Sequence, residues 1–310
     1  MTATIQTPPR ARPVQIRRKP VRRATERRGA WFVLPFLGAF VLFMITPLGY
    51  AIYTSLYTTR LIGGTVFSGF ANYQQTLGSG EFWSGVIRTV IYAVIQIPVM
   101  LAIAFFFATI FDLGLVKFGR LFRTIFFIPF AVPAVVGAVM WSFLLEPQFG
   151  PFTRLLDGIG VNGVNFFSPK LILPTIILIV IWEWTGYNMV ILYTALKSVP
   201  RDIVEAALLE GASVWRIILW IKLPMVRPAI VMLVLLNVIG ALQLFTEPMI
   251  LGYFQTQAIA TNFTPTIYIY NTAIGGQQYD LAAAAAVVLG LFIAVISVGS
   301  LLFRRRRGEL

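Results

Sequence analysis

The chain has 310 residues, of which 58% are hydrophobic and only 12% are charged, and its mean hydropathy is +0.80. Soluble globular proteins carry roughly 25% charged residues, so these values exclude an ordinary soluble protein and favour one that lies in a lipid bilayer. The chain contains neither Cys nor His, which excludes disulfides, thiolate or imidazole metal sites and catalysis by either side chain. We therefore expect no catalytic site and no metal site.

Six long stretches of the chain carry either no charge or a single one. They are 19 to 31 residues long, and a helix needs about 20 apolar residues to cross about 30 Å of hydrocarbon. The strands of a membrane barrel would instead be alternating segments of about 10 residues. We therefore predict an all-α membrane protein with six transmembrane helices. The stretches are 29–59, 89–111, 124–145, 171–196, 228–246 and 281–303.

The distribution of Lys and Arg predicts how these helices are oriented. With six spans both termini lie on one side, and that side receives 21 of the 25 basic residues. Because basic segments are retained in the cytoplasm, both termini are predicted to be cytoplasmic. We expect a basic disordered tail (1–28), a six-span domain (29–303) with a cytoplasmic loop at 198–227, and a short basic tail (304–310). The first tail either binds anionic lipid or serves only as a topology signal.

Prolines interrupt the predicted third span. Pro129 and Pro133 are one turn apart, and Gly137 follows them. Proline is tolerated in a spanning helix where neighbouring groups or water satisfy the freed carbonyl. Such kinks suit a transport pathway, although they occur in membrane helices generally.

A glycine pattern in the next external loop resembles a nucleotide-binding motif. Gly158, Gly160 and Gly163 have the spacing G-x-G-x-x-G. The dinucleotide-binding fingerprint also requires a preceding strand, a following helix and a later acidic residue, and none is predicted here. We interpret the three glycines as turn residues. No phosphate-binding G-x-x-x-x-G-K-[ST] sequence occurs, so ATP hydrolysis through such a loop is not expected on this chain.

The cytoplasmic loop before the fifth span has the pattern of a helical hairpin. Asp202 and Glu205 have the spacing of a capping box, and Pro200 suits a first helical turn. Ala207 and Gly211 are four residues apart, so we expect them to share a helix face that allows close approach of another protein. Gly211 also permits a turn into a second short helix. The alternative is an amphipathic hairpin lying on the membrane surface.

This loop resembles the EAA motif of permeases from binding-protein-dependent ABC importers. The resemblance implies a coupling helix that docks into a cleft on a separate P-loop ATPase, with Ala206, Ala207 and Gly211 in the docking face. Glu205 would pair with a basic group of the ATPase, and Pro224 would end the element. The matching residues are Glu205, Ala206, Ala207, Gly211, Ile221, Leu223 and Pro224.

From about residue 30 to residue 303 the chain is similar to the carbohydrate branch of this family, of the maltose and glycerol-phosphate permease type. The resemblance implies the ABC type I importer permease fold in the inner membrane of a prokaryote. It implies a second homologous permease, ATPase subunits that hold the ATP and Mg²⁺, and an extracytoplasmic solute-binding protein. We expect the chain to contact membrane lipid. We expect no cofactor on this chain and no binding of nucleic acid. Among its marks are Phe70 to Tyr73, Gly150-Pro151, Trp182 to Gly186, and Asp280.

Polar side chains inside the fourth and fifth spans are candidates for the solute pathway. Glu183 lies in mid-span, where a charged side chain costs about 2.5–3.5 kcal/mol on insertion scales, so it must face protein or a water-filled cavity. Carboxylates, amides and aromatic rings are the groups that a sugar would contact. The alternative is that they are interhelical contacts. The candidates are Glu183, Tyr187, Asn188, Asn237, Gln243 and Glu247.

We therefore predict the permease subunit of an ATP-driven sugar importer, which itself catalyses no reaction. One alternative is an importer permease for an amino acid, a glycerol phosphate or a polyamine. An ion-coupled secondary transporter would carry its own coupling carboxylates and paired discontinuous helices. A membrane scaffold without transport would not require the small-residue loop.

Overall fold

A computed structural model describes residues 24–60, 62–254 and 259–306. Residues 1–23 and 307–310, which make up most of the two predicted basic tails, lie outside the described residues. The chain divides after Tyr50 into two units, which are described separately. Helix α1 begins at Ala24, so residues 24–28, predicted as disordered, are helical, and the last helix continues to Arg306 rather than ending at residue 303.

The first unit contains most of the first spanning segment. Helix α1 (Ala24–Phe40) passes through a π-helical turn, η1 (Val41–Ile45), into α2 (Thr46–Ser55). The hydroxyl of Thr46 donates a hydrogen bond to the carbonyl of Val41 at 2.9 Å, which satisfies an acceptor that the wider turn displaces. Every described side chain from Trp31 to Tyr50 is exposed. This long apolar surface is what a helix in contact with lipid requires.

The second unit, which begins at Ala51, continues from the end of α2 into a short hairpin and a helix. The antiparallel strands β1 (Tyr57–Arg60) and β2 (Gly64–Phe67) are followed by α3 (Ala71–Gly78). The amide of Asn72 donates hydrogen bonds to the carbonyls of Ser55 and Tyr57, at 2.9 and 2.7 Å, and fixes the hairpin to α3. Asp280 accepts a bond from the Thr59 backbone N–H at 2.5 Å. These contacts give the segment Phe70 to Tyr73 and Asp280 a structural role.

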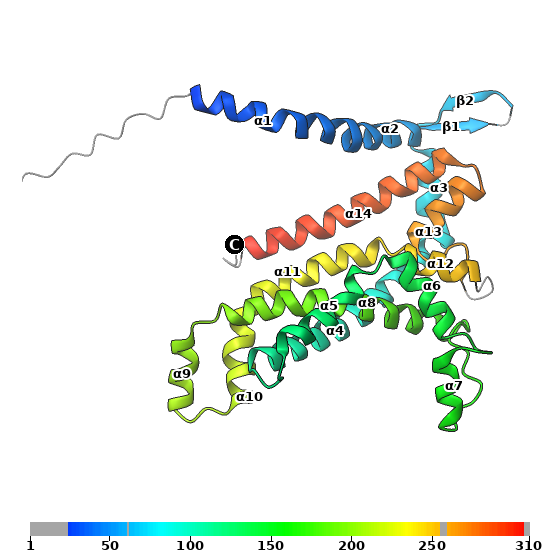
Figure 1. Ribbon diagram of the computed structural model, residues 1–310. Helices are drawn as coiled ribbons and strands as arrows, with labels where there is room; N and C mark the ends of the chain where they lie inside the picture. Colours follow the sequence, from blue (N-terminus) through cyan, green and yellow to red (C-terminus); the bar gives the residue numbers. More distant parts are fainter. Residues whose placement is uncertain (1–23, 61, 255–258, 307–310) are drawn as a thin grey trace, which may run out of the picture. The chain divides into compact units, whose positions relative to one another are not determined.

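The core of the second unit is the packing of α4 (Gly80–Asp112) against α8 (Ile172–Lys197) (Figure 1). Ala104 and Ala108, one turn apart on α4, are fully buried, and small residues at this spacing let helix backbones approach closely. Helix α4 begins nine residues before the charge-free stretch that predicted it. Arg88 is accommodated inside the helix because its guanidinium donates to the carbonyls of Asn262 and Phe263, at 3.3 and 2.9 Å.

The predicted third span is sharply bent. It consists of α5 (Gly119–Ala131) and α6 (Ala134–Leu144), which meet at 97°. Val132 is extended because it precedes Pro133, and Pro133 begins the second arm. Glycines allow both arms to pack closely against α8. A Cβ on Gly186 would lie 1.8 Å from the carbonyl oxygen of Phe126 in α5, and one on Gly137 in α6 would lie 2.5 Å from a carboxyl oxygen of Glu183.

Among the described residues, five helical segments are long and apolar enough to span a membrane, and α5–α6 makes a sixth when the pair is counted as one span. The predicted helical membrane protein is thereby confirmed, apart from the small hairpin. Gly160 and Gly163 adopt positive φ angles of 87° and 71°, as expected of turn residues, whereas Gly158 is the last residue of a helix. The remaining elements are α7 (Pro151–Gly158), α9 (Arg201–Leu209), α10 (Val214–Arg216), the π-helix η2 (Ile217–Lys222), α11 (Leu223–Leu242), α12 (Thr246–Phe254), α13 (Pro265–Tyr270), the π-helix η3 (Asn271–Gly275) and α14 (Tyr279–Arg306).

Candidate coupling surface and solute pathway

The loop at 198–227, which we call the coupling loop, is a helical hairpin at one end of the second unit (Figure 1). Helix α9 ends in a left-handed turn at Gly211, where φ is +81°. Two hydrogen bonds close this turn, from the N–H of Ala212 to the carbonyl of Ala207 at 2.9 Å and from the N–H of Gly211 to that of Leu208 at 3.0 Å. The Ser213 hydroxyl then accepts a bond from the N–H of Arg216 and caps α10.

The hairpin differs from its prediction in three details. Helix α9 begins at Arg201 with Pro200 at its N-cap and no side-chain cap, so Asp202 and Glu205 do not form a capping box. Gly211 lies beyond the helix in the left-handed turn, so it does not share a helix face with Ala207. Pro224 does not end the element: it lies in the first turn of α11, directly after the wider turns of η2, which leave room for its ring.

The coupling loop exposes small and apolar side chains outside the spanning helices. Glu205, Ala206 and Gly211 are exposed, and Ala207 is half-buried. Leu209, at the end of α9, is 90% exposed. Soluble segments rarely leave such apolar surface uncovered unless a partner buries it. Ile221 and Leu223 are half-buried, and Pro224 is exposed. This is a surface on which a partner could dock, and the roles assigned to its residues remain predictions.

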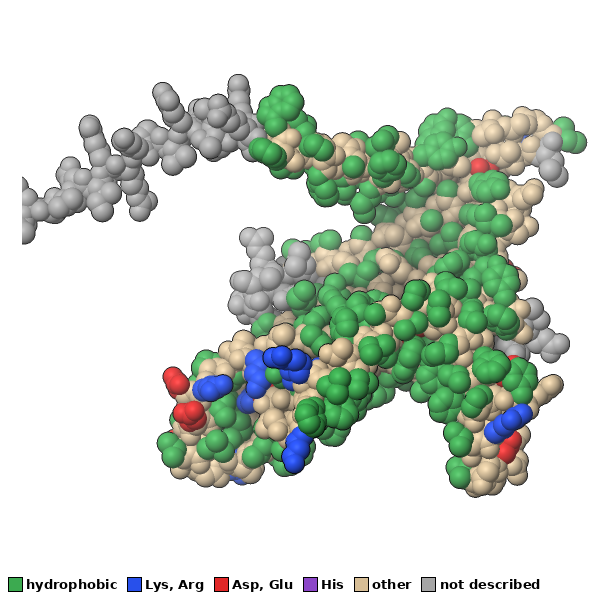
Figure 2. Space-filling view, in the orientation of Figure 1, with side chains coloured by type: hydrophobic (Ala, Val, Ile, Leu, Met, Phe, Trp, Pro, Cys, Tyr) green, Lys and Arg blue, Asp and Glu red, His purple; other side chains and the backbone are tan. Residues whose placement is uncertain are grey.

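An ion cluster anchors both ends of the coupling loop. Asp112, the last residue of α4, pairs with Lys197 at 3.1 Å and with Lys222, and its side chain is only 5% exposed. Lys197 also donates to the Asp112 carbonyl. Lys197 ends α8 and Lys222 precedes α11, so one carboxylate joins three helix ends. Figure 2 shows that Lys and Arg side chains gather at this end, while hydrophobic side chains cover the spanning segments.

In the middle of the bundle, amide side chains join three helices. Asn237 on α11 donates to the side-chain oxygen of Asn188 on α8 at 2.9 Å. Asn188 donates to the carbonyl of Trp184 and lies 3.7 Å from the sulfur of Met100 on α4. Gln96 donates to the same sulfur at 3.1 Å. Asn188 is fully buried and Asn237 half-buried, so these two predicted pathway residues form an interhelical contact.

Glu183 and Glu247 lie where two discontinuous helices meet. Helix α6 begins after the bend of the third span, and α12 begins after the break between Leu242 and Thr246; the two helices pack together. Glu183 is 4% exposed, and neither of its carboxyl oxygens has a hydrogen-bond partner in the described part of the chain. It interacts electrostatically with Glu247, which is also buried. Discontinuous helices of this kind line the substrate sites of many transporters.

The other two predicted pathway residues occupy different surroundings. Tyr187 stacks on Phe130, the second-last residue of α5, with ring centroids 4.7 Å apart and an interplanar angle of 25°. Trp184 packs edge-on against both rings and is 40% exposed. Gln243 is exposed where α11 ends. The structure therefore brings together Glu183 with Glu247 and Asn188 with Asn237, while Tyr187 packs with aromatic rings and Gln243 is exposed.

Asp112 and Gln96 were not predicted as contact residues. Asp112 lies directly after the charge-free stretch 89–111, and an acidic residue at the end of a span is a natural partner for basic loop residues. Gln96 is the one amide in the apolar stretch 89–111, and a polar residue in such a stretch predicts an interhelical hydrogen bond. Neither partner follows from spacing, since Asp112 is 85 residues from Lys197 and 110 from Lys222.

Known proteins resemble the chain over nearly its whole length. Residues 64–307 match the family model described as the inner membrane component of binding-protein-dependent transport systems. The chain is 31% identical over 309 residues to the probable ABC transporter permease protein y4oQ of Sinorhizobium fredii, covering 98% of this chain and 97% of that protein. It is also 31% identical over 291 residues to the lactose transport system permease protein LacF of Rhizobium radiobacter, covering 90% and 95%.

A solved structure has a similar fold. It is that of a bacterial ABC transporter involved in the import of the acidic polysaccharide alginate, with a TM-score of 0.76 and 21% sequence identity. The match covers 91% of this chain and 96% of that one. At this identity the likeness bears on the fold alone. It confirms the predicted ABC importer permease fold.

Proposed function

We propose that this chain, which belongs to the family of binding-protein-dependent transport system inner membrane components, forms the membrane pathway for a sugar or oligosaccharide. The family makes the chain a multi-pass permease subunit of an ABC importer in the inner membrane. In the proposed importer both termini are cytoplasmic, a second permease completes the pathway, and an extracytoplasmic binding protein delivers the solute. Separate ATPase subunits, which dock on the coupling loop, hold the ATP and Mg²⁺.

The observation that carries the proposal is the exposed coupling loop held by Asp112. Helix α9 presents Glu205 and Ala206 to solvent, while the ion cluster fixes the two ends of the loop. A docking element must combine these properties, because a force applied to a loosely attached helix would be lost in local motion. A rigid attachment to three spanning helices passes that force into the bundle.

The same attachment suggests how ATP hydrolysis would move the pathway. Helix α10 and the π-helix η2 continue directly into α11, which ends at the break before α12. Displacement of α9 would therefore shift α11 and the start of α12, where Glu247 faces Glu183. A two-state rearrangement at this discontinuous segment would open the pathway alternately to each side.

The sugar assignment rests on the named relative that transports lactose and on the groups near the acid pair. Glu183, Glu247 and the exposed face of Trp184 offer carboxylates and an aromatic ring, which are suited to hydroxyl groups and to the apolar face of a sugar. Two neighbouring carboxyl groups suit a neutral sugar better than an anionic solute, because an anion would be repelled by whichever of them is ionised.

The experiment that tests the proposal is affinity purification of the tagged chain from native membranes in a mild detergent, with mass spectrometry of its partners. We expect a P-loop ATPase, a second permease and a solute-binding protein. Ala206→Trp, on the exposed face of α9, should remove the ATPase while membrane insertion is retained. Gly211 is a poorer target, because its φ of +81° strains any other residue.

Leu155→Trp is the matched control. Leu155 lies on α7 and is 66% exposed, and α7 is at the opposite end of the second unit (Figure 1). This variant should retain the ATPase. Retention of the ATPase by Ala206→Trp would contradict docking on the coupling loop. Purification of the wild-type chain without any ATPase would instead favour an ion-coupled secondary transporter, for which Glu183 and Glu247 would be the coupling groups.

A further inference from the structure

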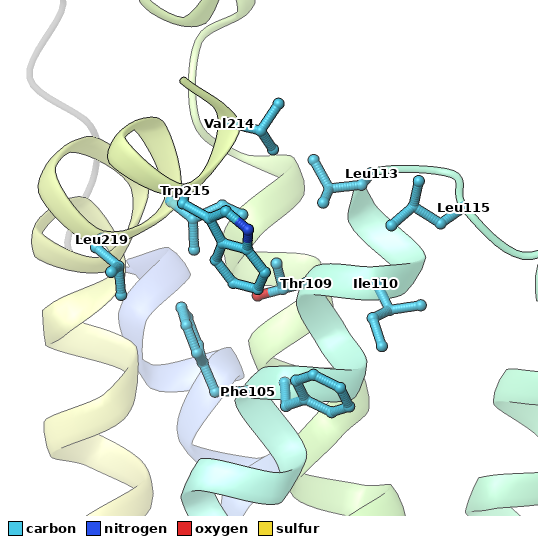
Figure 3. Close-up of a pocket in the computed structure, with 10 residues that line it drawn as sticks. Phe105, Thr109, Ile110, Leu113, Leu115, Val214, Trp215 and Leu219 are labelled. Carbon is cyan, nitrogen blue, oxygen red and sulfur yellow. The ribbon is translucent and has the colours of Figure 1, made fainter. Parts of the chain in front are cut away.

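The two ends of the second unit differ in where their short helices direct apolar side chains. At the coupling end, Trp215 and Leu219 project from α10 and η2 toward Phe105 of α4 and line a cavity of about 610 Å³ (Figure 3). At the other end, Leu155 on α7 is 66% exposed, and Ile159, the C-cap of α7, is 75% exposed. The apolar side chains of α7 therefore point away from the described part of the chain.

Helix α7 is amphipathic over its whole length. At about 100° per residue, Leu155 lies about 60° from Phe152 around the helix axis, and Ile159 lies about 20° from it. Arg154 and Asp157 lie about 160° and 140° from Phe152, on the opposite side. All five residues are exposed. The helix therefore presents an apolar strip, formed by Phe152, Leu155 and Ile159, and a charged strip, formed by Arg154 and Asp157.

Contacts with α6 fix how α7 is rotated about its axis. The buried Thr153 hydroxyl donates to the carbonyls of Leu145 and Glu146, which follow α6, at 3.4 and 3.1 Å. The ring of Phe152 stacks on that of Trp141 in α6, with centroids 5.6 Å apart and an interplanar angle of 19°. The depth of Trp141 therefore shows which strip faces the membrane interior.

Trp141 lies within the hydrocarbon layer. Its ring packs edge-on against Trp182 of α8, with centroids 5.7 Å apart. Trp182 is 15 residues before Lys197, so at 1.5 Å per residue it lies about 22 Å along α8 from the Asp112 cluster. Charged groups stay at the edge of the hydrocarbon, which is about 30 Å thick. Both Trp rings thus lie inside the hydrocarbon, about 8 Å from the edge farther from the coupling loop.

The apolar strip of α7 therefore faces the membrane interior. Phe152 stacks on a ring inside the hydrocarbon, so the side of α7 that carries Phe152 is the side nearer the bilayer centre. Helix α7 also runs across the direction of α4, α8 and α11 (Figure 1), as expected of a helix that lies along a membrane surface. The charged strip, on the opposite side, faces water.

The composition of the two strips favours lipid over a protein as the partner. The apolar strip consists of hydrocarbon side chains alone, which bind a lipid leaflet without specific contacts. Phe149, two residues before α7, packs on Phe143 of α6 with ring centroids 5.4 Å apart, and both are exposed. The exposed apolar surface of the span thus continues to the start of α7. A protein that approached from the water would meet Arg154 and Asp157 instead.

From this geometry we propose that α7 is an interfacial helix, which inserts Phe152, Leu155 and Ile159 into the lipid leaflet farther from the coupling loop. The bilayer then holds the end of α6, the helix whose Gly137 approaches Glu183. The anchored helix fixes one side of the discontinuous segment at the acid pair. Lipid insertion of α7 requires only that the chain spans a membrane, so it is tested without an ATPase or a known solute.

The chain lacks cysteine, so one introduced thiol carries a nitroxide label at a chosen residue. Full-length Leu155→Cys and Arg154→Cys are labelled and reconstituted into phosphatidylcholine vesicles. Power-saturation EPR measures the collision rates of each label with oxygen, which concentrates in hydrocarbon, and with a neutral nickel chelate, which stays in water. We expect the ratio of oxygen to nickel collisions at residue 155 to exceed that at residue 154 by about tenfold.

Matched variants locate the effect. Leu209→Cys carries the label at another highly exposed leucine, at the end of α9 in the coupling loop, and its ratio should resemble that at residue 154. Adding Ile159→Glu to Leu155→Cys should lower the ratio toward that at residue 154, because a carboxylate in the apolar strip opposes insertion. Adding Asp157→Ala, in the charged strip, should leave the ratio unchanged.

Two results would overturn the proposal. Equal ratios at residues 154 and 155 would mean that α7 lies in water. Low collision rates with both reagents at residue 155 would mean that a protein covers the strip, which in these vesicles is a second copy of the chain. The same pair of labels is measured in the complete importer purified from native membranes, with the cysteine-free parent as the background. Low rates at residue 155 there would assign the strip to a partner subunit and would equally overturn lipid insertion.

Discussion

Two buried acidic side chains of this permease have opposite surroundings: one is paired with basic groups and the other is not. Asp112, at the end of α4, is 5% exposed and is neutralised by Lys197 and Lys222. Glu183, in the middle of α8, is 4% exposed, and its carboxyl oxygens have no hydrogen-bond partner in the described chain. Its neighbour is a second acid, Glu247.

This difference indicates that Asp112 stabilises the structure, whereas Glu183 serves the function. Buried charges are normally paired, because an unpaired one loses its hydration without compensation. Asp112 follows this rule and joins three helices at the end that carries the coupling loop. Glu183 breaks it where two discontinuous helices meet, and unsatisfied ionisable groups inside membrane proteins are usually retained for function. The comparison predicts that removing the two side chains has opposite effects on stability.

The largest effect is expected from Asp112→Ala. The substitution leaves the partly buried ammonium of Lys222 without its partner, and removal of one member of a buried pair costs about 3 kcal/mol. The coupling loop should become mobile at both ends. Thermal unfolding of the purified chain in detergent, followed by tryptophan fluorescence, measures the loss, and limited proteolysis should cut first between residues 198 and 216.

Asp157→Ala provides the control for Asp112→Ala. Asp157 is an exposed acidic residue of α7 that forms no ion pair among the described residues. The change there should alter stability by less than about 0.5 kcal/mol. Equal losses in the two variants would show that the ion cluster does not anchor the loop.

Glu183→Met is expected to act in the other direction. Replacing a buried, unpaired acid by an unbranched apolar side chain should raise stability, by about 1–2 kcal/mol, and should abolish solute-stimulated ATP hydrolysis in the reconstituted importer. The same unfolding measurement tests the first effect. A more stable variant with full transport would show that Glu183 is dispensable for the pathway.

Gly137 supplies an independent check on the position of Glu183. A Cβ at this residue would lie 2.5 Å from the Glu183 carboxyl oxygen, so Gly137→Ala should destabilise the chain by about 1–2 kcal/mol. In a Glu183→Ala background the oxygen is gone, and the same change should cost almost nothing. Equal costs in both backgrounds would place the carboxyl group elsewhere.

The contrast between the two acids also explains what sequence alone could predict. Charge-free stretches predicted the spans because the bilayer constrains each helix locally. The hairpin of the coupling loop was likewise predictable, since a glycine turn depends on neighbouring residues. The capping box predicted at Asp202 and Glu205 was wrong, because Pro200, rather than an acidic side chain, precedes the first turn of α9.

Contacts between residues far apart in the chain could not be predicted from the sequence. Pro133 indicates an interruption, but the 97° bend also depends on Gly137 and Gly186, which let the two arms approach α8. The pairing of Asp112 with two lysines and that of Asn188 with Asn237 depend on which helices become neighbours. The acid pair was predicted as two separate candidates, because nothing in their spacing of 64 residues places them together.

The smallest expected changes in stability come from replacing the two lysines of the Asp112 cluster one at a time. The Lys222 side chain is 11% exposed and that of Lys197 is 48% exposed. An exposed ion pair contributes about 0.2–1 kcal/mol and is screened by salt, so Lys197→Gln should cost a few tenths of a kcal/mol and nothing at high salt. Lys222→Gln should cost about 1 kcal/mol or more at any ionic strength. Unfolding curves at low and high salt measure both. Equal, salt-sensitive losses would mean that water reaches Asp112 and that the cluster is a surface contact, in which case the comparison with Glu183 would no longer hold.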